Sequence, residues 1–246
     1  MDSVAAHLLL CAVLLLSAST QALTGFGFGL VALAILGSWM DLRDAVVLTA
    51  PAGLVLNIAL FLKLRRAFTF DDLVPLLMAC LAGVPIGVWL VLNMGPRGLK
   101  LLMAFIMITT ALHRMWVIQQ KEPGKVWHPV KAGIPCGLLS GILGGAFGVG
   151  GPPVVSYLVN RSMDRFRYVA TVQVVAGGTA IIRLVQFAQA GRYEEVPYWM
   201  FVTTFASVLI GVFIGMRLLR KISDQGSQKG ILVFLILGGL YYLIQA

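Results

Sequence analysis

The most informative segment of the chain reads Gly144-Gly145-Ala146-Phe147-Gly148-Val149-Gly150-Gly151-Pro152-Pro153. Five glycines in eight residues, followed by two prolines, cannot continue an α-helix. The segment nevertheless lies inside an uncharged run that extends from residue 132 to residue 160. At membrane depth, irregular backbone is tolerated only where protein buries it or where it lines a cavity, because unpaired peptide groups are costly in hydrocarbon. We therefore predict that this break forms half of a binding site.

The composition is that of a polytopic membrane protein. Of the 246 residues, 59% are hydrophobic and 12% are charged, and the mean hydropathy is +0.91, whereas soluble domains carry about 25% charged residues. The charges occur in short clusters between apolar runs of about 20 residues, the length that crosses a bilayer as a helix. We predict an all-α fold with apolar segments at 4–23, 30–40, 45–62, 73–94, 101–112, 132–160, 169–189 and 196–218, and a last span that ends near residue 244.

Several classes of protein are excluded by the same patterns. The net charge of +9 does not indicate nucleic-acid binding, because the Lys and Arg residues flank apolar spans instead of forming one face of a soluble module. The cysteines Cys11, Cys80 and Cys136 form no C-x-x-C pair, and no His-Glu-x-x-His motif is present. His7 and His113 lie near span ends, where heme ligation is not indicated. We therefore expect neither an enzyme nor a redox relay, and no cofactor or metal ion.

The N-terminal segment resembles a signal peptide, since an apolar run is followed by small and polar residues. However, the first residues carry Asp2 and no Lys or Arg, which argues against export and cleavage. We expect this segment to remain in the protein as its first helix.

An internal repeat relates the two halves of the chain at an offset of about 122 to 124 residues. The offset places Gly25-Phe26-Gly27-Phe28-Gly29 near residues 145–151, Pro75 on Pro197, and Ile86-Gly87 on Ile210-Gly211. A polar linker at 120–131 separates membrane repeat 1 (1–119) from membrane repeat 2 (132–246). The sequence thus predicts a gene duplication with two equivalent glycine-rich breaks.

The distribution of Lys and Arg among the loops predicts the topology. If each glycine-rich segment crossed the membrane once, ten basic residues would face one side and eight the other, which is no bias. If each segment enters and returns as a helical hairpin, fourteen share one side and only Arg43, Arg97, Lys100 and Arg192 face the other. This bias follows the positive-inside rule and makes the linker cytoplasmic. We predict two inverted repeats, each a glycine-broken helical hairpin followed by three transmembrane helices.

In this arrangement both hairpin tips reach the middle of the membrane from opposite sides. A helix begins after each break, and a helix N-terminus offers free N–H groups and about half a positive charge. Packing is the usual role of an isolated transmembrane glycine, but the density and repetition of glycines here favour the binding of a small anion. The predicted substrate-binding residues are Gly25, Phe26, Gly27, Gly29, Asn57, Gly145, Phe147, Gly148, Gly150, Gly151, Pro152, Gln173 and Arg183.

Arg183 is the only charged residue inside an apparent span. An intramembrane ionisable side chain is a functional hypothesis by default, and a guanidinium suits an oxyanion. Because Arg183 lies about two turns from the end of its span, snorkelling to the interface stays open as an alternative. Asn57 and Gln173 could supply further donors or could bond between helices. All ten acidic residues lie at span ends or in loops, so no buried carboxylate for a proton relay is indicated.

The paired signatures Thr24-Gly25-Phe26-Gly27-Phe28-Gly29 and Gly144 to Pro153, with a basic loop after the second and the duplication, resemble the sulfite exporter TauE/SafE family of membrane transporters. The resemblance covers nearly the whole chain. It implies a protein of the bacterial cytoplasmic (inner) membrane that transports a small sulfur-containing anion: sulfite, an organosulfonate such as sulfoacetate, or thiosulfate. Because only the two glycine-rich stretches match the family's motif, the resemblance implies a binding role for those two stretches alone.

The function expected from these observations is secondary transport of such an anion by alternating access. A passive anion channel of the same fold, and a permease for thiosulfate or another oxyanion, stay open as alternatives. The sequence also leaves open import or export, coupling to protons or other ions, and whether the protein forms a homo-oligomer.

Overall fold

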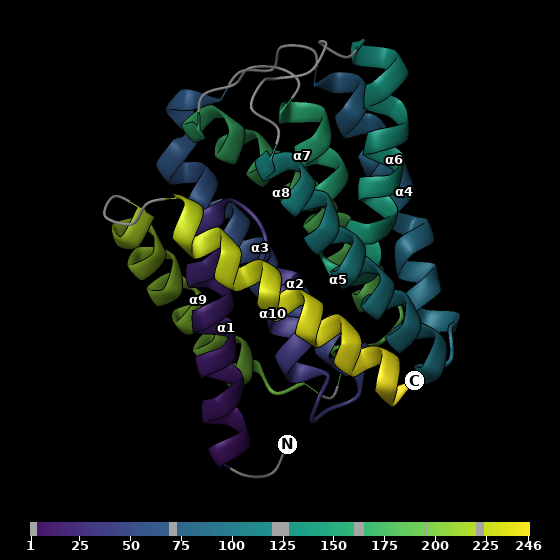
Figure 1. Ribbon diagram of the computed structural model, residues 1–246. Coiled ribbons are helices and arrows are strands. Elements are labelled where there is room, and N and C mark those ends of the chain that lie inside the picture. Colours follow the sequence, from purple (N-terminus) through teal and green to yellow (C-terminus); the bar gives the residue numbers. More distant parts are fainter. Residues whose placement is uncertain (1–3, 69–72, 120–127, 160–164, 195, 220–223) are drawn as a thin grey trace.

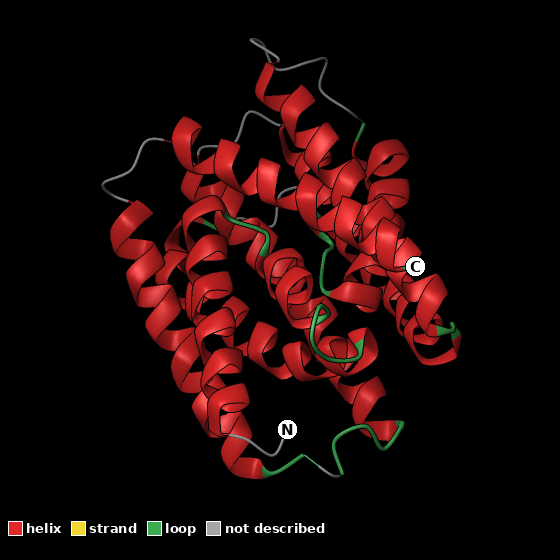
Figure 2. Cartoon of the chain, turned by 60° about the horizontal axis from the view of Figure 1, so that its bottom comes forward, coloured by secondary structure: helices red, strands yellow, loops and turns green. Residues whose placement is uncertain are grey.

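The structure is a computed structural model of the chain, and it describes residues 4–68, 73–119, 128–159, 165–194, 196–219 and 224–246. Helices make up nearly all of these residues, with short loops between them and no strand in the described ranges (Figure 2). The first half contains α1 (Val4–Thr24), α2 (Phe28–Leu36), α3 (Leu42–Leu64), the 3-10 helix η1 (Arg65–Ala67), α4 (Val74–Asn93) and α5 (Pro96–Gln119). The second half contains α6 (Pro129–Phe147), α7 (Gly151–Val159), α8 (Arg165–Gln189), α9 (Tyr198–Leu219) and α10 (Asp224–Gln245).

The molecule is an all-α polytopic membrane protein. Within the described part of the chain, six helices are long and apolar enough to cross a bilayer, at Ala5–Thr24, Leu42–Ala67, Val74–Asn93, Val130–Phe147, Phe166–Gln189 and Tyr198–Leu218. Large apolar side chains such as Met78, Phe105 and Leu237 are 62%, 65% and 61% exposed, respectively. These exposed apolar side chains suit contact with lipid tails, whereas small and polar side chains are found inside the bundle.

Several predicted boundaries differ from the structure, among them the start of α8, which lies at Arg165 and not at residue 169. Helix α5 runs from Pro96 to Gln119, well beyond the predicted segment at 101–112, because Lys and Arg favour helices and do not stop them. Helix α2 ends at Leu36, not at residue 40, and the chain leaves it in a turn in which the N–H groups of Ser38 and Trp39 donate to the carbonyls of Ile35 and Leu36. Helix α6 begins at Pro129, inside the predicted linker, and residues 120–127 of that linker lie outside the described residues.

The two halves of the chain are interlocked. In Figure 1, α1 rises from the N-terminus at the bottom, whereas α6 descends from the top. Helix α1 packs against α9 of the second half, and in the matching way α6 packs against α4 of the first half. Helices α3 and α8 pair with each other, as do α5 and α10. Every one of these pairs is consistent with a two-fold relation between the halves, as the internal repeat predicts.

Loops that the charge count assigns to one membrane side lie together at one end of the bundle. The Arg43 Nη2 donates to the carbonyl of Met94 at 2.6 Å, which joins the start of α3 to the turn between α4 and α5. The Arg192 guanidinium pairs with the Asp44 carboxylate at 2.8 Å. The structure therefore groups these loops as predicted, while the side of the membrane that they face stays a prediction.

Glycines allow the backbones of α4 and α6 to touch. A Cβ atom added at Gly137, Gly141 or Gly145 of α6 would collide with the carbonyl oxygen of Leu76, Cys80 or Val84 of α4, respectively. The equivalent contact between α9 and α1 is similar, because a Cβ at Gly211 would lie 2.5 Å from the carbonyl oxygen of Leu15. Such small-residue ridges are a common means of close helix packing in membranes.

Replacement of Gly141 by alanine is expected to destabilise the protein by about 1–3 kcal/mol, because the new methyl group must push two backbones apart. The matched control is Gly133→Ala, on the same ridge of α6, where the nearest atom to an added Cβ is 3.5 Å away. Thermal unfolding in detergent should show a lower Tm for Gly141→Ala and little change for Gly133→Ala. Equal Tm values for the two variants would contradict the packing described here.

Candidate functional site

Each half contains one break, and left-handed glycines form both. Gly25 and Gly27 have φ of +85° and +107°, and Gly148 has φ of +69°. Gly27 is the N-cap of α2, and Gly148 closes α6 by donating its N–H to the carbonyl of Gly144 at 2.8 Å. Residues with a side chain rarely adopt this conformation, so glycine is required at these three turns.

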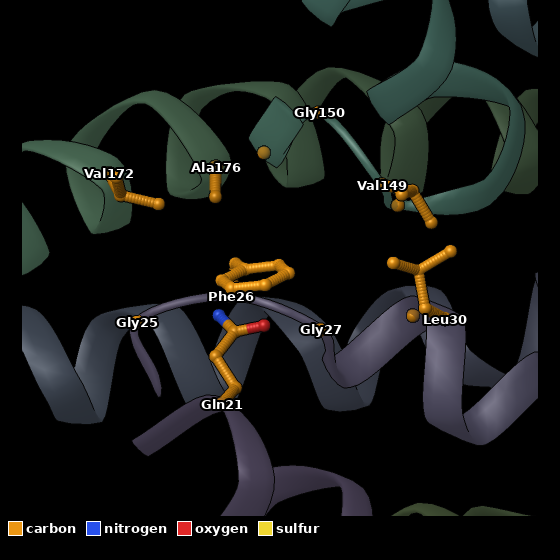
Figure 3. A pocket seen from close by; sticks show the side chains of 12 residues that line it. Gln21, Gly25, Phe26, Gly27, Leu30, Val149, Gly150, Val172 and Ala176 are labelled. Atoms are coloured by element: carbon orange, nitrogen blue, oxygen red, sulfur yellow. The ribbon is translucent and has the colours of Figure 1, made fainter. Parts of the chain in front are cut away.

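The two breaks meet inside the bundle. A Cβ atom added at Gly29 would lie 2.6 Å from the carbonyl oxygen of Phe147 and 3.0 Å from that of Gly148. One added at Gly151 would lie 3.2 Å from the Cβ of Phe26. Figure 3 shows the segment from Gly25 to Gly27 opposite the second break. The prediction that the two glycine-rich stretches face each other is therefore confirmed.

Two small cavities are lined by residues of both breaks, and a third of about 20 Å³ lies beside the second break alone. The tip cavity, of about 30 Å³, is lined by Gln21, Val172, Ala176 and both breaks, including Gly25 to Gly27 and Gly148 to Gly151 (Figure 3). The Arg183 cavity, of about 40 Å³, adjoins it through shared residues and is lined by polar side chains from α1, α3 and α8. These polar residues are Gln21, Thr49, Asn57, Thr179 and Arg183. Since one water needs roughly 10–15 Å³ on this scale, each cavity has the size of a few waters or a small ion.

Arg183 is a buried cation. Its side chain is 4% exposed, and its Nη2 donates to the carbonyl of Val46 at 2.6 Å, while its Nε has no hydrogen-bond partner. Its Nη1 lies 2.5 Å from the position of an added Cβ at Gly148, at the second break. No acidic side chain pairs with it among the residues that the structure describes. Because a snorkelling arginine would expose its guanidinium, burial excludes that alternative, and a buried unpaired charge calls for an anion.

A proline in α3 shapes the surroundings of Arg183. Pro51 has no N–H, so the carbonyl of Val47, four residues earlier, loses its helical donor. The Tyr193 hydroxyl, in the loop before α9, donates to this carbonyl at 3.1 Å. Burial raises the pKa of Tyr193 to about 12, against the opposing effect of the Arg183 charge, so the hydroxyl remains a donor at neutral pH. Tyr193 and Arg183 thus bind adjacent carbonyls of α3.

A buried amide network joins α1, α3 and α8 beside the cavities. The Gln21 Nε2 donates to Asn57 Oδ1 and to Gln173 Oε1, both at 3.0 Å. Gln21 Oε1 accepts the N–H of Phe28, the first residue of α2, at 3.1 Å, and Gln173 Nε2 donates to the carbonyl of Gly25 at 3.3 Å. The sequence prediction did not include Gln21, which lines both cavities. Its signal was a long amide inside the first apolar span.

The structure brings most of the predicted site residues together. Gly25, Phe26, Gly27, Gly29, Asn57, Gly148, Gly150, Gly151 and Arg183 line the two cavities. Gln173 lies behind them and reaches the site through Gln21. Gly145 instead faces Val84 of α4, and the buried Phe147 lines neither cavity. Pro152 lies in the first turn of α7, and its side chain is outside those that the structure describes.

The two helix N-termini are not equivalent as donors. In α2 the first N–H is taken by Gln21, while the next two belong to Gly29 and Leu30, which line the tip cavity. In α7 the residues after Gly151 are Pro152 and Pro153, which carry no N–H. Arg183 lies beside the second break, so a cation is present where amide donors are scarce. The expectation of two similar amide sites therefore needs this correction.

A serine hydroxyl supports the second break. The buried Ser140 Oγ of α6 donates to the carbonyl of Gly150. Its counterpart at the repeat offset, Ser17, donates instead to the carbonyl of Val13 in its own helix at 2.7 Å. Only the first of these bonds satisfies a carbonyl in an irregular segment.

The Ser140→Ala variant is expected to lose about 1–3 kcal/mol of stability, because the Gly150 carbonyl is left without its donor. Ser17→Ala is the matched control and should cost clearly less, since the helical N–H still serves the Val13 carbonyl. Hydrogen exchange should show faster exchange around Gly148 to Gly151 in Ser140→Ala only. Equal protection in both variants would mean that Ser140 does not hold this segment.

A helical membrane bundle with two broken hairpins that meet at a buried, cation-lined cavity has the architecture of a membrane transporter. The family described as sulfite exporter TauE/SafE matches residues 9–242, and the chain belongs to this family. It is a family of transporters, so the resemblance seen in the sequence is confirmed. A search of the curated proteins and a search of the solved structures found no match.

Proposed function

We propose that the protein is a secondary transporter that carries a small sulfur-containing anion, sulfite or an organosulfonate such as sulfoacetate, across the bacterial cytoplasmic membrane by alternating access. The observation that carries this proposal is Arg183, a buried cation with an unpartnered Nε that lines a cavity between the two breaks. An oxyanion would neutralise this charge and accept hydrogen bonds from its free donors.

The lengths and directions of the hairpin arms support inverted repeats with the site near the midplane. Helices α2 and α7 have nine residues each, or about 14 Å at ~1.5 Å per residue, which is about half of a ~30 Å hydrocarbon core. Helices α1 and α6 enter from opposite ends of the bundle (Figure 1). Tips that start at opposite ends and meet would do so near mid-depth, as inverted-repeat transporters require.

The size of the site favours a compact anion in this conformation. The Arg183 cavity of about 40 Å³ suits sulfite better than sulfoacetate, which would need the cavity to widen. Direct contact between the tips at Gly29 and the Phe147 carbonyl also favours a carrier over an open channel. A permease for thiosulfate or another oxyanion would use the same Arg183, so it is tested beside the main proposal.

The test is uptake of radiolabelled sulfite, sulfate, thiosulfate, sulfoacetate and taurine into proteoliposomes, with and without a pH gradient. We expect saturable sulfite uptake and accelerated exchange when unlabelled sulfite is trapped inside. Uptake that does not saturate and shows no counterflow would identify a channel instead. Failure of all five compounds to enter would overturn the proposal.

A further inference from the structure

The groups at the two ends of the buried amide network determine which side-chain atoms in it donate and which accept hydrogen bonds. At one end, Gln21 Oε1 receives the N–H of Phe28, a backbone group that can only donate. At the other end, Gln173 Nε2 reaches the carbonyl of Gly25, a group that can only accept. Side-chain amides can turn over, but these two anchors leave one arrangement in which every bond joins a donor to an acceptor.

This arrangement dictates which end of Asn57 faces the Arg183 cavity. Since Gln21 must present its Nε2, Asn57 must turn its Oδ1 toward Gln21, at 3.0 Å. The Nδ2 group of Asn57 is then left with two donors, and none of the described residues accepts a hydrogen bond from it. Asn57 is 6% exposed and lines the same cavity as Arg183. These two donors are therefore free to bond to a ligand in that cavity.

We propose that Gln21 is the positioning residue of the site: it holds Asn57 as a hydrogen-bond donor beside Arg183, and so selects ligands whose oxygens only accept hydrogen bonds, the property of a fully deprotonated oxyanion. The proposal rests on the anion-transport function and deepens it. Gln21 acts through Asn57, and it joins this selection to the hairpin itself because it also caps the first N–H of α2.

The test is a double-mutant cycle on sulfite binding, measured with ³⁵S-labelled sulfite and purified full-length protein. Gln21→Met, of similar size, frees Asn57 to turn, and we expect about tenfold weaker binding, the effect of one hydrogen bond to a charged group. In an Asn57→Leu background, Gln21→Met should have no further effect on affinity, because the two residues act as one unit. Additive losses, or unchanged affinity in Gln21→Met, would overturn the proposal.

Gln173→Met is the matched control. Gln173 receives the second hydrogen bond of the same Gln21 Nε2 but lines neither cavity. It should lower the Tm, and any loss of sulfite affinity that it causes should add to the loss in Asn57→Leu, because Gln173 does not orient Asn57.

A second route keeps the proposal testable if Gln21→Met does not fold. Gln21→Glu keeps the shape of the side chain and can still accept the Phe28 N–H, but its other oxygen needs a donor and so turns Asn57 the opposite way. The added charge weakens binding in any background, so only the additional loss that disappears with Asn57→Leu reports on orientation. If the wild-type protein binds no sulfite at all, the proposed transport function fails. If the wild type binds sulfite but the cycle shows no coupling between Gln21 and Asn57, only the proposed role of Gln21 fails.

Discussion

Replacement of Arg183 by methionine is expected to weaken sulfite binding by about 100-fold or more, because the site loses its only described charge and several donors. The same change should leave the Tm of the ligand-free protein unchanged or raise it, since an apolar side chain removes the cost of burying a charge. The measurement is thermal unfolding with and without sulfite, together with uptake into liposomes. The expected result is a variant that unfolds at a normal or higher Tm, but whose Tm no longer rises when sulfite is added.

Arg192→Met is the control for this experiment. Arg192 lies in the turn that follows α8, the helix of Arg183, but it is partly exposed and paired with Asp44. Exposed ion pairs contribute about 0–1 kcal/mol, so stability should change little and sulfite binding should persist. If sulfite still raised the Tm of Arg183→Met, Arg183 would not be a sulfite-binding residue.

Replacement of Gly29 by alanine is expected to separate the two hairpin tips. The new methyl group would lie 2.6 Å from the carbonyl oxygen of Phe147, which belongs to backbone and cannot swing aside. We expect a loss of about 1–3 kcal/mol, or roughly 2–4 °C in Tm for each kcal/mol at this chain length. Since the cavity is formed by the contact, sulfite binding should weaken as well.

Gly53→Ala serves as the stability control. An added Cβ at Gly53 in α3 lies 3.5 Å from the ring of Phe28, the residue next to Gly29, which is an ordinary contact. Alanine favours a helix over glycine by about 1 kcal/mol, so the Tm should hold or rise. If Gly29→Ala were as stable as Gly53→Ala, the tips would not be in the close contact described.

The sequence predicted the break regions well because helix breakers carry a strong local signal. Glycines at Gly25 to Gly29 and Gly148 to Gly151 are denser than helix packing alone requires, and the repeat related one stretch to the other. Their contact followed from the count of basic residues in the loops, which suggested that the hairpins enter from opposite sides. The burial of Arg183 was not decided by sequence, because the depth of a side chain depends on the tilt of its helix.

Residues that act through distant partners were harder to predict. Gln21 bonds to residues 36 and 152 positions away, so no local pattern marks it. Gly145 was grouped with the break by proximity, although its four-residue spacing from Gly141 and Gly137 is the pattern of helix packing, which its contact with Val84 bears out. Its predicted role in substrate binding has no support from the cavity lining.

The pairing of α1 with α9 has a consequence for biogenesis. Helix α1 leaves the ribosome well before α9, since the glycines that pack against it, Gly211 and Gly215, are made about 190 residues later. Until α9 is inserted, Ser19 and Ala22 lack their contacts with Gly211 and Gly215, so the first hairpin lies in the bilayer without the helix that packs most closely on α1. We expect chains that stop before α9 to leave α1 open to quality-control proteases, and chains that include α9 to protect it.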